Sequence, residues 1–94
     1  PTAMIEVEAG DVFTISSESA SISLGSTDLN YGFTPDALGG DGTIYVTVFR
    51  NGELDANEII TAIEDTAYSG DIVVTTSEAG DSYTIFISEI GFPL

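Results

Sequence analysis

Carboxylates are almost the only side chains in this sequence that could take part in chemistry. The chain has 94 residues, of which 16 are Asp or Glu and one is basic (Arg50), and it contains no His and no Cys. Without His or Cys it cannot form a Ser-His-Asp or Cys-His nucleophilic site. Carboxylate pairs of the glycosidase type remain, but so many carboxylates in a small domain make some close pair inevitable. We therefore expect a protein that is not an enzyme.

Calcium is the metal ion that such oxygen-rich loops could hold. Two loops bring acidic residues together in the sequence: Asp36 with Asp41 in a glycine-rich segment, and Glu78 with Asp81 in a later one. Both patterns are also typical of solvated loops. The sequence therefore predicts no cofactor, and these four residues are the candidates should calcium bind.

The charge balance limits the partners that the chain could have. Its net charge is −15 at pH 7. Nucleic acids and anionic membranes both require Lys and Arg for binding, so neither is an expected partner. Copies of the chain repel one another at low salt, and this repulsion is screened beyond about 10 Å at about 0.1 M salt. Basic surfaces and divalent cations remain, unless the acidity serves only to keep the protein soluble.

Length and apolar content indicate one folded domain over residues 1–94. Hydrophobic residues make up 43 % of the chain, which is enough for a globular core. No segment approaches the roughly 20 apolar residues of a membrane-spanning helix, and no signal peptide is recognisable. Pro1 could be the native start of an unexported protein, because an initiator Met is commonly removed before Pro, or it could be a processing site.

Alternating apolar and polar residues predict about seven short strands. The expected strands cover 5–9, 12–15, 20–24, 29–33, 43–50, 72–76 and 82–88. Segment 43–50 is apolar on both faces, with Val46 and Val48 on one and Tyr45 and Phe49 on the other. This pattern predicts a central strand or one that is covered on both sides. Asn51-Gly52 after it predicts a turn.

A change of period after this turn predicts one helix over about 56–67. Asp55 can cap a helix, and Glu58 stands three residues later, where it can reach back to the capping residue. Gly70 is a natural terminator. The β-branched residues of 59–63 would alternatively form a strand, but the capping signals favour the helix. The expected fold class is thus α+β, mostly antiparallel β with one helix.

The order of expected elements over 51–88 resembles a known structural unit. Residues 54–63 and 72–74, then Gly80 and 83–88, resemble the β-α-β-β unit of flagellar hook-associated and flagellin-like proteins and of phage virion proteins. In that unit an Ala-Ile pair, here Ala62-Ile63, closes a short helix. The resemblance implies a subunit of a filament or a virion shell, without an active site.

A second resemblance implies a different fold. Residues 71–88 resemble the E and F strands of immunoglobulin-like sandwiches, with Tyr83 as the corner tyrosine. The Cys pair and the core Trp of that family are missing, and Ile85 stands where the second Cys would be. An all-β immunoglobulin-like sandwich is therefore the alternative fold.

Apolar residues near both ends are the candidate assembly contacts. Met4, Ile5, Phe92 and Leu94 are apolar residues near the termini of a very acidic chain. We expect such segments to dock on the domain itself or on a neighbour by strand addition. Arg50 is a further candidate, since the single cation could pair with a carboxylate of its own chain or of a neighbour.

These observations together predict a non-catalytic structural protein. We expect a phage-type virion component, such as a capsid decoration or tail protein, or a filament subunit. Its partners would be copies of itself, as a homo-oligomer, or a larger shell or filament protein, and its location a virion or an extracellular assembly. The alternative is an extracellular adhesion or calcium-binding module at a cell surface.

Overall fold

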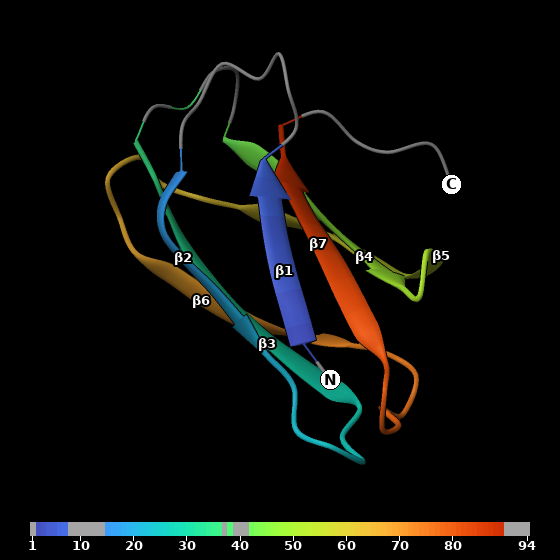
Figure 1. Cartoon of the computed structure of the whole chain (residues 1–94). Helices are drawn as coiled ribbons and strands as arrows, with labels where there is room; N and C mark the ends of the chain where they lie inside the picture. The colour runs from blue at the N-terminus through green and yellow to red at the C-terminus, as the bar shows by residue number, and fades with distance from the viewer. Residues whose placement is uncertain (1, 8–14, 37, 39–41, 90–94) are drawn as a thin grey trace.

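The chain forms two β-sheets that pack face to face (Figure 1). The computed structural model describes residues 2–7, 15–36, 38 and 42–89. The strands are β1 (Thr2–Val7), β2 (Ile15–Ser21), β3 (Asp28–Pro35), β4 (Thr43–Arg50), β5 (Glu53–Thr61), β6 (Tyr68–Val73) and β7 (Ser82–Ser88). One sheet has the order β1-β7-β4-β5 and the other the order β2-β3-β6.

Antiparallel pairing dominates, which confirms the expectation of a mostly antiparallel β protein. The pairs β2–β3, β3–β6, β4–β5 and β4–β7 are antiparallel. Only β1 departs from this pattern among the described strands, because it runs parallel to β7. The strand boundaries differ from the expected ones at β1, β2 and β6, and the expected strand at 12–15 lies mostly outside the described residues.

The helix expected over 56–67 is wrong, and the α+β class is wrong with it. The described residues contain no helix, and so none that could span a membrane. Residues 53–61 form β5 instead, paired with β4 from Arg50 opposite Glu53 to Thr43 opposite Thr61. Pairing with an apolar neighbour strand has overridden the local capping signals. The strand alternative for 59–63 holds as far as Thr61.

The turn between β4 and β5 is the one that Asn51-Gly52 predicts. Asn51 has φ of 53° and Gly52 has φ of 85°, so both central residues are left-handed as in a type I′ turn. Arg50 and Glu53 are the paired residues that flank it. This two-residue turn fixes the register of the hairpin.

The core lies between the two sheets. Its buried side chains come chiefly from the inner faces of β3, β4, β6 and β7: Leu29, Tyr31, Phe33, Ile44, Val46, Val48, Ile72, Tyr83, Ile85 and Ile87. β4 has neighbours on both sides in its sheet, as expected of a central strand. Val46 and Val48 face the core, whereas Tyr45 and Phe49 lie on the opposite face of β4. The core therefore uses only one of the two apolar faces of this strand.

Candidate functional site

In the four-stranded sheet, β4 is paired with β5 on one side and with β7 on the other. Over these paired residues, the outer face of the three strands carries no charged side chain. Residues on this side alternate with the buried core residues and are matched across the strands. They are Tyr45, Thr47 and Phe49 on β4, Leu54, Asn57 and Ile59 on β5, and Thr84, Phe86 and Ser88 on β7. We call these nine residues the uncharged face.

The outer face of the other sheet is different. There Asp28 and Asn30 of β3 lie opposite Val73 and Asp71 of β6, and all four are exposed. Carboxylates thus stand on this surface, as on most of a chain with net charge −15. The outer face is therefore acidic over β3 and β6 and uncharged over β4, β5 and β7. Beyond β7, Glu6 of β1 stands in register opposite Phe86.

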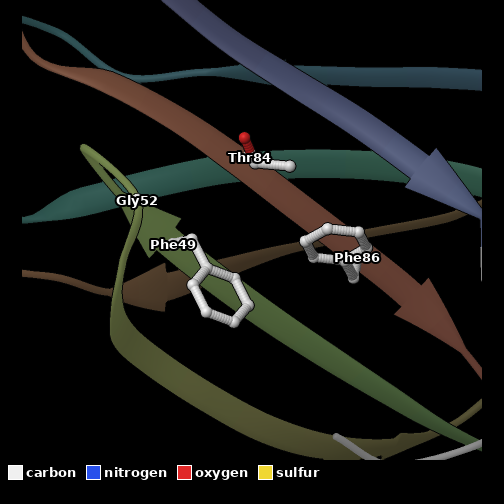
Figure 2. Close-up of a pocket in the computed structure, with 4 residues that line it drawn as sticks. All are labelled: Phe49, Gly52, Thr84 and Phe86. Atoms are coloured by element: carbon white, nitrogen blue, oxygen red, sulfur yellow. The ribbon is translucent and has the colours of Figure 1, made fainter.

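Two aromatic rings lie on the uncharged face beside Thr47, which is at its centre and is fully buried. Phe49 and Phe86 meet edge to face with ring centroids 5.6 Å apart and an interplanar angle of 86°, a favourable geometry for two rings. With Gly52 and Thr84 they line an open hollow of about 270 Å³ (Figure 2). The hollow is mostly apolar, with the Thr84 side chain at its edge.

Aliphatic side chains extend the uncharged face over β5. Ile59 is 62 % exposed and Leu54 is 43 % exposed. Between the strands, Thr47 Oγ1 donates a hydrogen bond of 2.8 Å to Asn57 Oδ1, so the polar groups here satisfy one another. Leu54 and Ile59 stand on either side of Asn57 on this face. Exposed apolar side chains on one face of a small protein are typical of an interaction surface.

A cluster around Asp81 fixes one end of the sheet. The Asp81 carboxylate accepts hydrogen bonds from Asn51 Nδ2 at 2.9 Å, from the Glu78 N–H at 2.8 Å and from Arg50 Nε at 2.9 Å. These donors, Asn51 and Glu78 first and then Arg50, lower the pKa of Asp81 to about 2. Since Asn51 also accepts from the Ser82 N–H at 3.0 Å, the β4–β5 turn is tied to the start of β7.

Two further carboxylates join β5 to distant segments of the chain. Tyr31 donates its hydroxyl hydrogen to Glu58 Oε1 at 2.5 Å. Asp55 accepts from the Thr75 N–H and from the Thr75 hydroxyl, both at 2.8 Å. Burial, and then the bond to Glu58, raise the pKa of Tyr31 above its ordinary value. Of the two residues expected to cap a helix, Glu58 therefore holds β5 to the opposite sheet and Asp55 holds it to the segment that follows β6.

The four calcium candidates do not come together as one described cluster. Asp36 is exposed at the end of β3, and Asp41 lies outside the described residues. Glu78 and Asp81 are close, but the Asp81 carboxylate is engaged by Arg50 and Asn51. Within the described ranges, no three acidic side chains are grouped so that they could hold a metal ion.

The candidate assembly residues fall in three places. Met4 and Ile5 lie in β1, opposite Thr84 and Ile85 of β7. Arg50 forms an ion pair of 2.9 Å with Asp81 of its own chain. Phe92 and Leu94 lie outside the described residues. The uncharged face itself was not foreseen as a site, although the second apolar face of 43–50 was its signal in the sequence.

Comparisons with protein-family models, with curated proteins and with solved structures give no match to this chain.

Proposed function

We propose that this protein is a non-catalytic structural protein that assembles with copies of itself through the uncharged face. The observation that carries the proposal is the contrast between this face, which has no charged residue, and a net charge of −15 on the whole chain. The setting, a phage-type virion component or a filament subunit, comes from the sequence resemblance. That resemblance is weakened because the helix of the β-α-β-β unit is absent over 56–67.

The acidic charge of the other surfaces favours the uncharged face as the place where a second copy binds. Contacts through most other surfaces would bring carboxylates of one copy against carboxylates of the next, and pairing of buried like charges costs several kcal/mol. Two uncharged faces can meet without that cost. Aromatic side chains such as Phe49 and Phe86 are enriched in the cores of such interfaces. A two-fold contact of this face with itself is the simplest arrangement.

The hydrogen bonds that the central carboxylates accept support a structural role. Asp55, Glu58 and Asp81 each accept hydrogen bonds that hold strands or layers together. Asp81 in particular is a poor general base, since its three donors stabilise its ionised form. The proposal therefore retains the expectation that the protein is not an enzyme.

We further propose that the sandwich is immunoglobulin-like. The pairs β3–β6 and β4–β7 correspond to the B–E and C–F pairs of that fold, and β6 and β7 lie in different sheets as E and F do. Tyr83 is buried near the start of β7, but its hydroxyl has no hydrogen-bond partner among the described residues. It therefore lacks the bond that defines a tyrosine corner.

The test of self-assembly is the mass of the protein in solution, measured by light scattering across protein and salt concentration. We expect a monomer at low salt and a rising mass as salt screens the repulsion. Ile59→Glu places a charge on the uncharged face and should abolish the rise. Val73→Glu is the matched control, because Val73 is 71 % exposed but lies on β6 in the other sheet. A monomer under all conditions, or equal behaviour of the two variants, would reject the proposal.

The two-layer arrangement also favours the alternative function, an extracellular adhesion or calcium-binding module, because many cell-surface domains are built as sandwiches. Melting temperature measured with calcium and with a chelator separates the two. A large rise with calcium would support the module by linkage, whereas a salt-dependent mass without any calcium response would support the assembly protein.

A further inference from the structure

The pairing of β1 with β7 differs from every other strand pair among the described residues. It is parallel, and it runs from Thr2 opposite Ser82 to Val7 opposite Ile87. Among the described strands, β1 lies at the edge of its sheet, where its one neighbour is β7 (Figure 1). β7, in contrast, is bonded on its other side to β4. Within the described part of the chain, the backbone of β1 is therefore paired along one side only.

The side of β7 that faces away from β4 needs a paired strand. Tyr83, Ile85 and Ile87 of β7 are fully buried in the core. If β1 were absent, the outward N–H and C=O groups of β7 would be unpaired beside these core residues, and such an edge is a template for another strand. The remaining strands would still form two antiparallel sheets, β7-β4-β5 and β2-β3-β6.

The link from β1 to the rest of the chain is long enough to release it. Residues 8–14 separate β1 from β2, and seven residues span up to about 24 Å when extended. β1 and β2 belong to different sheets. Movement of β1 away from its own β7 therefore needs no change in the pairing of any other strand.

We propose that β1 is an exchangeable strand, which pairs with β7 of a second copy of this chain in the same register as in the monomer. The contact in the pair of copies is chemically the same as the contact within one chain. The two states differ in whether residues 8–14 join β1 to strands of its own domain or lead to a second copy. They differ also in the repulsion between two acidic domains that are brought close together. Exchange from copy to copy would build a chain or a closed ring without any new surface.

Protein concentration sets the balance between the two states. A link as short as these seven residues presents its strand at an effective concentration on the order of 1 mM, so exchange competes when the protein reaches a similar concentration. The net charge of −15 opposes it at low salt. Densely packed assemblies exceed this concentration, whereas a dilute solution does not.

A pair of engineered cysteines reads out the exchange directly, because the chain has no Cys of its own. Thr2→Cys with Ser82→Cys places the two thiols at paired positions of β1 and β7. Paired residues on neighbouring strands are about 4.8 Å apart, within the range that a disulfide bridges. The protein is equilibrated in about 1 M NaCl to screen its charge, oxidised briefly and separated on a denaturing, non-reducing gel.

We expect linked multimers in an amount comparable to the internally linked monomer near 1 mM protein, and about a hundred-fold less near 10 µM. The control pair is Thr2→Cys with Ala67→Cys, since Ala67 is exposed and belongs to neither β1 nor β7. Multimers of the paired variant that do not exceed those of the control at either concentration would overturn the proposal.

This test is independent of the uncharged face. Adding Ile59→Glu to the cysteine pair should leave the linked multimers unchanged while it abolishes association through that face. Loss of the multimers on this addition would show that contact through the uncharged face, and not strand exchange, had brought the cysteines together.

Discussion

The Tyr31 hydroxyl donates a hydrogen bond of 2.5 Å to Glu58 Oε1, and this bond joins the middle strand of one sheet to the edge strand of the other. Tyr31 also stacks on Phe33 and Tyr68, with centroids 6.4 Å and 6.1 Å away. Glu58 lies on the inner side of β5, opposite Val46 of β4. An acidic side chain can occupy this position because a buried phenol satisfies it.

Tyr31→Phe should therefore destabilise the fold. The substitution keeps the ring and its stacking but leaves the Glu58 carboxylate without its donor. Loss of a hydrogen bond to a charged group costs about 1.5–3 kcal/mol, and urea unfolding would measure it. Glu58→Gln keeps an acceptor oxygen and should cost less. Equal stability of Tyr31→Phe and the wild type would show that the bond contributes nothing to folding.

Alkaline pH should weaken the protein through the same residue. The folded-state pKa of Tyr31 is raised above its ordinary value of 10.0, so the neutral phenol is favoured in the folded protein. The resulting stabilisation is fully present below pH 10 and is lost as the pH rises beyond it towards the folded-state pKa. Burial also raises the pKa of Tyr83, which adds to the effect. Thermal unfolding from pH 8 to 12 should show the decline, and Tyr31→Phe should make it shallower.

Acid should weaken the protein through Asp81. Its pKa is lowered from the ordinary 3.8 to about 2 by Asn51, Glu78 N–H and Arg50. The sign is the reverse of that for Tyr31: the stabilisation is present above pH 3.8 and is lost as the pH falls through 2. Asp81→Asn should lower the melting temperature at pH 6, and its difference from the wild type should shrink towards pH 2. Asp71→Asn, at an exposed position on β6, serves as the control.

Two turn glycines should respond differently to alanine. Gly42 has φ of 79° and Gly52 has φ of 85°, so both take a conformation that alanine adopts only at a cost. A Cβ at Gly42 would lie 2.8 Å from the Ala62 carbonyl oxygen, whereas a Cβ at Gly52 would meet nothing within 4 Å. Gly52→Ala should cost about 1 kcal/mol, and Gly42→Ala more. Chemical denaturation compares them, and an equal loss would mean that the contact with Ala62 relaxes freely.

Local sequence patterns were sufficient for the central part of the fold. The two apolar faces of 43–50 indicated a central strand, and β4 is central. Asn51-Gly52 indicated the turn, and alternation over 82–88 indicated a strand with the bounds that β7 has. In each case the residues that decide the outcome are neighbours in the sequence, so the pattern is visible without knowledge of the fold.

The helix at 56–67 could not be rejected locally, because the partners that decide it are distant. Asp55 and Glu58 have the spacing of a capping box, but their hydrogen-bond partners are Thr75 and Tyr31, 20 and 27 residues away. The uncharged face escaped prediction for the same reason. It depends on the register of β5 and β7 against β4, which no single segment encodes.

Repulsion between copies should be strongest from carboxylates next to the uncharged face. Glu53 begins β5 beside Leu54 and is exposed, so it lies at the rim of the proposed contact. Glu53→Gln removes one charge from each copy. At about 0.2–1 kcal/mol for an exposed charge pair, association should tighten by up to about five-fold and should need less salt. Asp71→Asn removes the same charge from the opposite sheet, beyond about one screening length at physiological salt, and should change association less. Sedimentation equilibrium over a series of NaCl concentrations measures both, and an equal response would locate the contact elsewhere on the molecule.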